Sequence, residues 1–406
     1  MKRLLILGAG AQGSTVAKRM NEEPQVSEII CADYDEKAVL EMAGTLSKVK
    51  ALQVDASNIE NIINAAKGTD LVVNALPISF ASRVIEAALR AKVNYQDFAA
   101  GDDEGIDYVE GIKTMLTTKS DQFKAAGLTA LISTGSAPGL VNVIARATTD
   151  ELDRCGAIHI FVYEGVKAKR FLPFWWSPEV AYADMHDMAY IFENGKVVET
   201  EAFSRPVWIK FKGFDEEIRL IEHAHDEPVT MGLLANKYLN GAQHIWFKYG
   251  GFGVEFAEPL YKMGLLSDKP IDVNGTIIAP RDVVLKLTPA APKYESEIKE
   301  ILDEGLESDT GALLIRVIGE REGKQVQIDN YVNTPTCQDA FRKSGLTSET
   351  YLTGQCGALF TKMLVNDKIS QAGLFPPEAL ESDQRAYYLD EAAKLDITVE
   401  RIIEVL

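Results

Sequence analysis

Residues 4–35 decide the fold of this chain: they begin LLILGAGAQGSTVAKRM and end EIICADYD. An apolar run leads into Gly8, Gly10 and Gly13 at the spacing G-x-G-x-x-G, and a helical pattern separates these from a second apolar run that ends at Asp33. The first glycine permits a tight strand-to-helix turn, the second lets the backbone approach a pyrophosphate, and the third lets the helix pack against the strand. We therefore predict dinucleotide binding rather than a glycine turn in an unrelated α/β domain.

Asp33 indicates which dinucleotide is bound. A carboxylate at the end of the second strand accepts hydrogen bonds from both ribose hydroxyls of NAD and repels a 2′-phosphate. Tyr34 follows it, not the arginine that often holds that phosphate, although Lys37 is near enough to keep NADP open. The sequence favours NAD over NADP. The predicted contacts in this segment are Gly8, Gly10, Ala11, Gln12, Gly13 and Asp33.

Composition excludes several classes of protein. The 406 residues carry a net charge of −18, which argues against nucleic acid and against an anionic membrane surface. The four cysteines are scattered without zinc spacing, so we expect reduced thiols and no metal site. The amino-terminal Met-Lys-Arg runs directly into the first strand, and no apolar stretch approaches 18 residues. We expect a cytoplasmic protein without a signal peptide or membrane span.

The pattern of elements predicts two domains of different construction. Strands and helices alternate over residues 1–145, which predicts a doubly wound parallel sheet of the Rossmann type. From about residue 150, alternating segments predict an α+β domain with a mixed or antiparallel sheet, with hairpin turns at Asn194-Gly195 and Glu322-Gly323. The end of the chain looks helical. The predicted domains are 1–145 plus 346–406 for dinucleotide binding, and 146–345 for substrate binding and dimerisation.

Further coenzyme contacts are expected where the strands of the first domain end. Asp55 could bond an adenine amino group or cap the next helix, and Ala56 follows it. VVNALP, residues 72–77, would shape the wall beside the nicotinamide-side ribose. The loop after the sixth strand offers backbone N–H groups. The contacts predicted here are Asp55, Ala56, Asn74, Ala75, Leu76, Pro77, Thr134 and Gly135.

Three residues are candidates for proton transfer. Asp97 ends the fifth strand and would either face the nicotinamide or act as a structural acid for the following loop; Asp102 and Asp103 look like a solvated turn. His223 and His225 would share one face of a strand, and imidazole titrates near neutral pH. A solvated loop is the competing interpretation for the histidines.

Other side chains could contact the substrate. His186 and Arg205 could bind a carboxylate, and Pro138 would occupy the first turn of the helix that leaves the domain, followed by Gly139. The aromatic run at Phe171, Phe174, Trp175 and Trp176 is typical of a core or interface but could wall a pocket. The predicted substrate contacts are Pro138, Gly139, Trp176, His186 and Arg205.

These segments together resemble the saccharopine dehydrogenase family, and within it lysine 6-dehydrogenases and saccharopine reductases. The similar stretches, in order, are LLILGAGAQGSTVA, LQVDASN, VVNALP, STGSAPGLVN, WWSPEVAYADMHDMAYIFENGKV, MGLLSDKPIDVNG and GLFPPEAL. The resemblance implies a two-domain oxidoreductase acting on the C–N bond of an amino acid, with carboxyl-terminal helices returning to the coenzyme domain and a homodimer. HAHDEP is instead similar to the saccharopine and carboxynorspermidine branches.

The leading hypothesis is an NAD(P)-dependent amino-acid dehydrogenase in which Asp97 or His225 moves a proton. Two alternatives remain open: an enzyme of carboxylated polyamine precursors, and a non-catalytic protein that binds NAD as a sensor.

Overall fold

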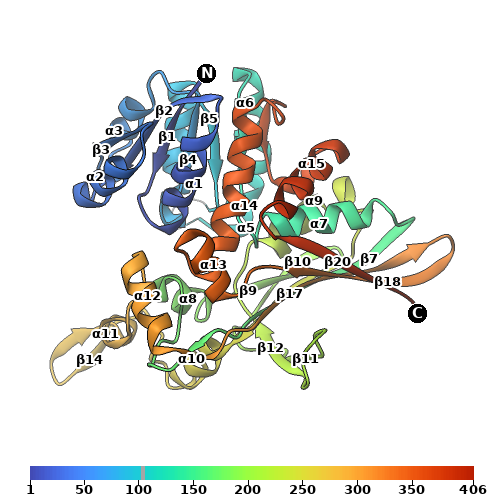
Figure 1. Cartoon of the computed structure of the whole chain (residues 1–406). Helices are drawn as coiled ribbons and strands as arrows, with labels where there is room; N and C mark the ends of the chain where they lie inside the picture. Colours follow the sequence, from blue (N-terminus) through green and yellow to red (C-terminus); the bar gives the residue numbers. More distant parts are fainter. Residues whose placement is uncertain (102–105) are drawn as a thin grey trace. The chain divides into compact units, whose positions relative to one another are not determined.

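A computed structural model describes residues 1–101 and 106–406, and it divides into two compact units (Figure 1). Unit 1 comprises Met1–Ala147 and Thr350–Ile397, and unit 2 comprises Thr148–Glu349 and Thr398–Leu406. Asp102 and Asp103, expected in a solvated turn, lie outside the described residues. Within the described part of the chain, no helix is both long and apolar enough to cross a membrane.

Unit 1 is built on a seven-stranded sheet in which every paired strand is parallel. Its order is β19-β6-β5-β4-β1-β2-β3, so the strand order reverses between β1 and β4. That reversal is where doubly wound sheets bind ligands. The strands are β1 (Lys2–Leu7), β2 (Val26–Asp33), β3 (Val49–Gln53), β4 (Leu71–Asn74), β5 (Asn94–Asp97), β6 (Thr129–Leu131) and β19 (Gly373–Phe375).

Continuous apolar runs form these strands because a parallel sheet is covered on both faces. Residues 4–7 of β1 are at most 1% exposed. The helices of unit 1 are α1 (Ala11–Glu22), α2 (Glu36–Thr45), α3 (Ile59–Ala66), α4 (Ala81–Ala91), α5 (Tyr108–Thr114), α6 (Ser120–Ala126), α7 (Leu140–Thr149), α14 (Ser348–Val365) and α15 (Ser382–Ala393), with α7 and α14 reaching the limits of the unit. Shorter helical turns are η1 (Ile78–Phe80), η2 (Met115–Lys119) and η3 (Pro377–Ala379).

Unit 2 is built on a nine-stranded mixed sheet, ordered β10-β9-β13-β7-β17-β18-β20 with β12 beside β13 and β11 beside β12. Strands β13 and β7 are parallel, whereas the other pairs are antiparallel. The strands are β7 (Arg154–Glu164), β9 (Ala189–Glu193), β10 (Lys196–Thr200), β11 (Val207–Ile209), β12 (Ile218–Glu222), β13 (His244–Gly251), β17 (Gly311–Arg321), β18 (Lys324–Asn333) and β20 (Thr398–Val405). The predicted fold class of both domains is therefore confirmed.

Both predicted hairpin turns are present. Asn194 and Gly195 have φ of 51° and 76°, and Glu322 and Gly323 have φ of 53° and 72°. Two consecutive positive φ angles match the right-handed twist of the strands that they join. Unit 2 also has two small sheets, β8 (Lys167–Ala168) with β16 (Leu306–Ser308) and β14 (Ile271–Val273) with β15 (Thr276–Ile278). Its helices are α8 (Pro178–Asp184), α9 (Glu227–Tyr238), α10 (Phe252–Lys262), α11 (Pro280–Leu287), α12 (Glu295–Glu304) and α13 (Cys337–Ser344).

The end of the chain differs from the prediction. We expected helices throughout residues 346–406 in the first domain, but β19 joins the first sheet and β20 pairs with β18 in unit 2. The prediction was wrong for β20 because TVERIIEV contains charged residues that also suit a helix. Its β-branched residues also suit an edge strand. Pairing of eight residues with β18 stabilises the strand over the helix.

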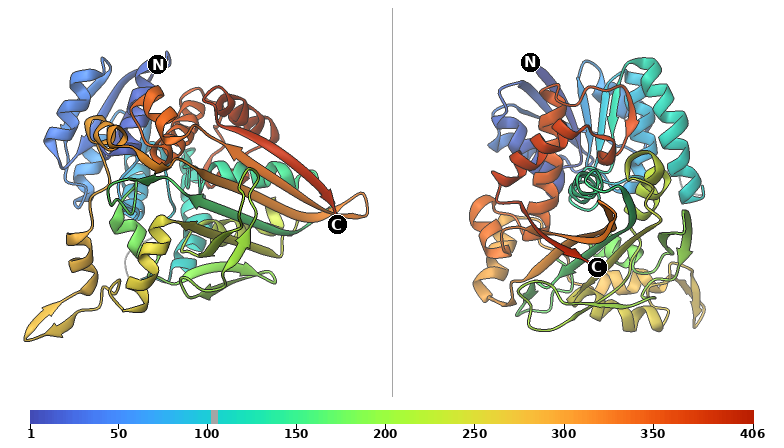
Figure 2. Two further views of the ribbon diagram at one scale, coloured as in Figure 1. Left: turned by 60° about the horizontal axis from the view of Figure 1, so that its bottom comes forward. Right: turned by 90° about the vertical axis from the view of Figure 1, so that its right-hand side faces the viewer.

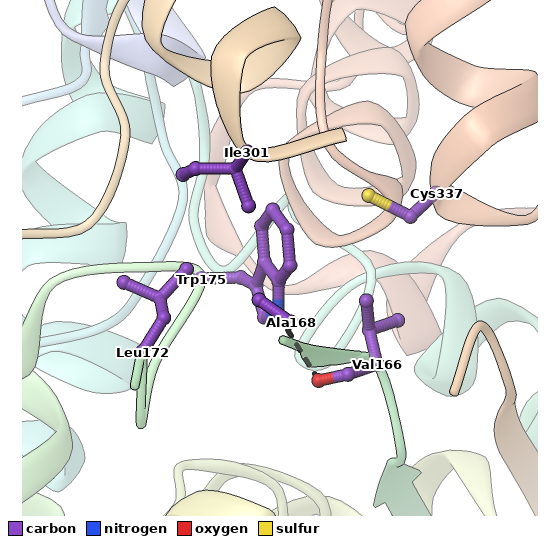
Figure 3. Close-up of a cluster of buried hydrophobic side chains, with 6 residues drawn as sticks. All are labelled: Val166, Ala168, Leu172, Trp175, Ile301 and Cys337. Atoms are coloured by element: carbon purple, nitrogen blue, oxygen red, sulfur yellow. Dashed lines mark hydrogen bonds between the residues drawn. The ribbon is translucent and has the colours of Figure 1, made fainter. Parts of the chain in front are cut away.

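The aromatic run divides among three environments. Phe174 and Trp175 belong to the core, at 2% and 4% exposed. Trp175 packs in a buried cluster and donates its Nε1–H to the Val166 carbonyl at 3.0 Å (Figure 3). Phe171 is 50% exposed, and Trp176 contacts a polar group described below.

Candidate active site

The glycines of the first loop have separate structural causes. Gly8 has φ of +99°, and a Cβ there would lie 2.6 Å from the Ala75 carbonyl oxygen. A Cβ on Gly13 would lie 1.9 Å from the Gly8 carbonyl oxygen, whereas one on Gly10 would meet nothing within 4 Å. The fold itself therefore requires Gly8 and Gly13, but it leaves open the space in front of Gly10.

That open space fits a pyrophosphate. Gly10 is the N-cap of α1 and supplies no side-chain cap, and no acidic residue lies in the first turn. The first N–H groups of the helix are therefore available to an anion, as a dinucleotide phosphate needs. Ala11 and Gln12 begin the helix at the same place.

Asp33 lies beside this loop. One carboxylate oxygen accepts the Ala9 N–H at 2.7 Å, and the other accepts the Asp35 N–H at 3.0 Å. These bonds fix the carboxylate against the glycine loop, where the predicted ribose contact would require it. Its contact with the coenzyme stays a prediction.

The segment after β3 is exposed at Asp55 and buried at Ala56. The Asp55 carboxylate accepts the Ser57 N–H at 2.9 Å, and hydrogen bonds from Ser57 lower its pKa. Asn58, not Asp55, is the N-cap of α3, because its side chain accepts the Glu60 N–H. The cap expected from this segment is therefore present but comes from Asn58, and the charged, exposed carboxylate of Asp55 remains open to an adenine.

A buried hydrogen-bonded chain connects the ends of β4, β5 and β6. Asn74 Nδ2 donates to Tyr95 Oη at 3.2 Å, and Tyr95 Oη donates to Asp97 Oδ2 at 2.9 Å. The other oxygen of Asp97 accepts the Ser133 N–H at 2.7 Å, and Asp97 is 1% exposed. This geometry favours the structural interpretation of Asp97, which anchors the loop that begins at Ser133.

The remaining predicted residues of unit 1 shape two turns. Ala75 donates its N–H to Leu7, and the Leu76 N–H donates to Asn74 Oδ1 at 3.2 Å, with Pro77 exposed after them. Thr134 is buried and donates to the Asp97 carbonyl.

Gly135 and Gly139 approach closely, since a Cβ on Gly139 would lie 2.0 Å from the Gly135 carbonyl oxygen. Pro138 was expected in the first turn of a helix, but α7 begins at Leu140, so Pro138 belongs to the preceding turn. Gly139 lies directly before the helix with φ of +131°, which lets the chain enter α7 against Gly135. Their substrate contacts stay predictions.

Unit 2 gathers polar groups where its parallel strands β7 and β13 end. Glu164 is the last residue of β7, and its Oε2 accepts Trp176 Nε1–H at 3.0 Å and the hydroxyl of Tyr249 on β13. Burial and the nearby carboxylate of Glu349 raise the pKa of Glu164 well above its usual range. Burial likewise raises the pKa of Glu349. Both side chains remain partly accessible.

The two predicted histidines join this cluster, which already contains Glu164, Tyr249 and Glu349. They lie in the loop between β12 and α9, not in the strand that we expected, yet their ring centroids are 5.8 Å apart. His225 stacks on Phe247 at 3.7 Å with an interplanar angle of 8°, and its Nδ1 lies 2.5 Å from Glu227 Oε2. Stacking and this bond fix the ring, which leaves Nε2 as the atom to exchange a proton with a ligand.

The two rings differ in charge. Burial lowers the pKa of His225, but Glu227 and other carboxylates outweigh that effect and raise it above its usual value. Burial and the neighbouring His225 lower the pKa of His223 to about 3, so His223 is neutral. Burial raises the pKa of Asp184, at the end of α8, to about 7. The group therefore combines an imidazole with a raised pKa, a neutral imidazole and several carboxyls.

Several buried atoms of this group lack partners. Among the residues that the structure describes, Glu227 Oε1, Glu349 Oε2 and His223 Nε2 are buried without a hydrogen bond. A buried acceptor without a donor costs about 1–3 kcal/mol, so unsatisfied atoms at one place indicate a ligand site. Because most of these groups are carboxyls, they suit a ligand that brings N–H donors and positive charge.

Arg205 does not face this group. It forms ion pairs with Glu193 at 3.1 Å and with Glu222 at 3.8 Å. Glu222 also forms an ion pair with Lys248 at 2.6 Å. Lys248 and Tyr249 are neighbours in β13, so their side chains point to opposite faces of the sheet, and Arg205 lies on the face of Lys248. Its guanidinium is therefore paired with carboxylates on the other face of the sheet, and the binding of a substrate carboxylate by Arg205 stays a prediction.

His186 follows Asp184 by two residues in the chain. Its Nδ1 is 3.1 Å from Asp187 Oδ1, and its ring centroid is 6.4 Å from that of Tyr261. The sequence analysis missed Glu164, Asp184, Glu227, Tyr249 and Glu349, which come from separate elements. Only Glu227 had a local signal, since it follows His225 by two residues. No group suited to a metal ion occurs among the described residues.

Comparison with known families matches nearly the whole chain. Residues 4–131 match the family model described as saccharopine dehydrogenase NADP binding domain. Residues 135–395 match the model described as saccharopine dehydrogenase C-terminal domain.

Two characterised relatives are similar over most of their length. The carboxynorspermidine synthase of Vibrio alginolyticus is 24% identical over 408 residues, covering 94% of this chain and 92% of the relative. The carboxyaminopropylagmatine dehydrogenase of a Synechocystis species is 24% identical over 391 residues, with 94% of each chain covered.

Solved structures show the same fold. The L-Glu-forming saccharopine dehydrogenase of Saccharomyces cerevisiae superposes with a TM-score of 0.68 at 16% identity, covering 100% of both chains. The homospermidine synthase of Legionella pneumophila, solved with NAD, gives a TM-score of 0.67 at 14% identity over 99% of this chain and 91% of the other.

Proposed function

Because this chain belongs to the saccharopine dehydrogenase family and is an NAD(P)-dependent dehydrogenase, we propose that it acts on the C–N bond of a carboxylated polyamine. The observation that carries this proposal is the group of buried carboxyls in unit 2 with unpartnered oxygens. A substrate with several ammonium groups supplies the donors and the positive charge that these oxygens lack. The names of the Vibrio and Synechocystis relatives support the same substrate class.

Unit 1 would hold the coenzyme. The open space before Gly10 and the uncapped helix α1 suit the pyrophosphate, and Asp33 suits the ribose hydroxyls, which favours NAD. The bound coenzyme would supply the hydride chemistry. The protein would position the reactants and exclude water.

Unit 2 would bind the amine and move the proton. Glu164 and Glu349 would accept hydrogen bonds from the ammonium groups, and Tyr249 and Trp176 hold Glu164 in place. His225, oriented by Glu227 and Phe247, would exchange a proton at Nε2 with the reacting nitrogen or with water. His223 stays neutral and would act as a hydrogen-bond partner.

The test is a coenzyme-reduction assay. Purified protein with NAD⁺ or NADP⁺ would be mixed with carboxynorspermidine, saccharopine, lysine and spermidine, and the absorbance of reduced nicotinamide followed. The proposal expects the highest kcat/KM with carboxynorspermidine and a preference for NAD⁺. Coenzyme binding without turnover of any amine would contradict it and would favour the non-catalytic NAD sensor.

A second candidate function is oxidation of an amino acid, lysine or saccharopine. The segment WWSPEVAYADMHDMAYIFENGKV favours it by resemblance to lysine 6-dehydrogenases, and it supplies Trp176 and Asp184 to the group in unit 2. A higher kcat/KM with lysine or saccharopine than with carboxynorspermidine would establish this candidate instead.

A further inference from the structure

Asp184 is a carboxyl group of unit 2 that takes no part in the proton transfer described above. It is half-buried at the end of α8, and the Ala224 N–H donates to its backbone carbonyl at 3.1 Å. This bond joins the end of α8 to the loop that carries both histidines. Within the described part of the chain, no group donates a hydrogen bond to the Asp184 carboxylate. A half-buried carboxylate of this kind is available to a ligand that brings N–H donors.

Two further acids lie close to Asp184. Burial lowers the pKa of His225, but three carboxylates raise it, and these belong to Glu227, Asp226 and Asp184. Glu227 is 0% exposed, and among the described residues its Oε1 has no partner, while its Oε2 lies 2.5 Å from His225 Nδ1. A fully buried acceptor without a donor is a second, independent sign of a ligand at this place. We call Asp184, Asp226 and Glu227 the Asp184 group.

A different pair of acids, Glu164 and Glu349, lies beyond the histidines. Glu164 ends β7 in the mixed sheet of unit 2 (Figures 1 and 2), and it accepts a hydrogen bond from the Tyr249 hydroxyl. The Tyr249 ring centroid is 4.6 Å from that of His223, which is 5.8 Å from that of His225. Contacts therefore run from Glu164 through Tyr249 and both imidazoles to the Asp184 group. The histidines thus separate two acidic groups.

Two separate acidic groups select an amine by the number and placement of its charges. An amine whose reacting nitrogen lies at His225 can place one ammonium group at Glu164 and another at the Asp184 group. An amine with a single ammonium group fills one of these positions and leaves the carboxylates of the other without donors. A site built to hydrogen-bond a polar group rejects the analogue that lacks it, because the buried groups of the site then stay unpaired.

We propose that Asp184 sets substrate specificity by binding a second ammonium group of the amine, on the opposite side of the reacting nitrogen from the ammonium group at Glu164. The inference rests on the proposed function, because it requires an amine in unit 2. It adds that the substrate carries a cationic nitrogen on each side of the reacting nitrogen. Asp184 binds the substrate in this account, and His225 remains the group that exchanges the proton.

Calorimetric titration of three amines into the NAD-loaded protein tests the role of Asp184. The first amine is carboxynorspermidine, the second is its analogue with a methyl group in place of the terminal ammonium group, and the third is its analogue without the α-amino group. Both analogues keep the central secondary amine, and each lacks one of the two outer cations. The titrations are made at pH 8, because burial raises the pKa of Asp184 to about 7 and its carboxyl is mostly charged at that pH.

Asp184→Asn and Asp187→Asn are the matched variants. Asp184→Asn keeps the size of the side chain and removes the charge that would bind the second ammonium group, and a neutral amide in a half-buried position does not oppose folding. Asp187→Asn removes the same charge three residues further on, where the side chain is 60% exposed and lies 3.1 Å from His186 Nδ1. This control therefore measures the effect of a nearby charge that does not bind the amine. Circular dichroism checks that both variants fold.

D184N should bind carboxynorspermidine about tenfold more weakly than the wild type, and D187N should bind it within about twofold of the wild type. D184N and the wild type should bind one of the two analogues equally, because that analogue lacks the ammonium group that Asp184 would bind. E164Q should instead match the wild type for the other analogue.

Equal affinity of D184N and the wild type for carboxynorspermidine would overturn the inference alone. Equal weakening of both analogues by D184N, or equal effects of D184N and D187N, would also overturn it. Absence of amine binding to the wild type would overturn the proposed function, and the inference with it.

Discussion

Two groups of buried carboxylates in this molecule differ in how completely they are hydrogen-bonded. In unit 1, Asp97 receives donors at both oxygens, from Tyr95 and from the Ser133 N–H. In unit 2, Glu227 and Glu349 each keep a buried oxygen without a partner among the residues that the structure describes. A satisfied buried carboxylate stabilises the fold that surrounds it, whereas an unsatisfied group costs stability and indicates a ligand. The difference favours a structural role for Asp97 and supports the proposed ligand site in unit 2, although the sequence offered proton-transfer candidates in both units.

The largest expected effect concerns His225. His225→Asn removes the ring that Glu227 and Phe247 orient, and with it the group that would exchange the proton. We expect kcat to fall about 1,000-fold, as for loss of a general acid–base catalyst. Steady-state kinetics with the amine found in the reduction assay measures this, and coenzyme affinity should stay unchanged. A fall of less than threefold would exclude His225 from proton transfer.

Glu164→Gln should act on the amine instead. The substitution keeps the size of the side chain but removes the charge that Glu164, despite its raised pKa, would acquire when an ammonium group binds beside it. We therefore expect about a 100-fold rise in the KM for the amine. Initial rates over a range of amine concentrations give this value. His225→Asn is its matched control, because that change should lower kcat with a smaller effect on KM. Equal KM values for wild type and E164Q would contradict the proposed role.

Asp97→Asn should act on stability. The amide places N–H donors where the Tyr95 hydroxyl or the Ser133 N–H now donates, and we expect unfolding to require about 2 kcal/mol less free energy. Urea denaturation measures it. If D97N kept full stability but lost turnover, Asp97 would be a catalytic residue after all.

Gly10→Ala sharpens the comparison within the coenzyme loop. A Cβ on Gly10 meets no protein atom, so the fold should be unaffected, while the pyrophosphate would lose its close approach to the backbone. We expect NAD affinity to fall about tenfold with an unchanged Tm. Gly13→Ala is the control: its Cβ would lie 1.9 Å from Gly8 O, so the Tm should drop. An unchanged NAD affinity in G10A would disprove the phosphate contact.

The smallest effect is a pH dependence of stability. Burial raises the pKa of Asp184 to about 7, so the folded state binds this proton more tightly than the unfolded state. The stability contributed by protonated Asp184 is present in acid and is lost as pH rises from about 4 through about 7. Asp184→Asn removes this loss. We expect the variant to gain about 1 kcal/mol relative to the wild type between pH 4 and pH 8, discounted for partial exposure. Urea denaturation at a series of pH values gives the unfolding free energy of both proteins. If this free energy changed equally with pH in the wild type and in D184N, the raised pKa of Asp184 would be refuted.

The sequence could predict the glycine loop and the first sheet apart from β19 because their signals are local. Apolar runs, Gly8, Gly13 and the two hairpin turns act within a few residues of one another. Strand β20 could not be predicted, since its partner β18 lies far away in the chain and its own pattern is ambiguous. The hairpin turn at Asn194-Gly195 could be predicted because these two residue types themselves favour the two positive φ angles that the turn requires.

The site could be predicted only in part. His223 and His225 stood out because histidines are scarce in this chain. Glu164 and Glu349 carry no local signature, since one ends a strand and the other lies in the first turn of a helix, and only tertiary folding places them together. Asp97 was expected near the nicotinamide from its place at the end of a strand. Its satisfied hydrogen bonds become apparent only once Tyr95 and Ser133 are located.

Calorimetric titration of carboxynorspermidine into the NAD-loaded wild type, D97N and E164Q is the most direct test of this account. D97N should bind the amine within threefold of the wild-type affinity, and E164Q should bind it about 100-fold more weakly. Retained affinity in E164Q together with lost affinity in D97N would place the amine in unit 1 and contradict the account.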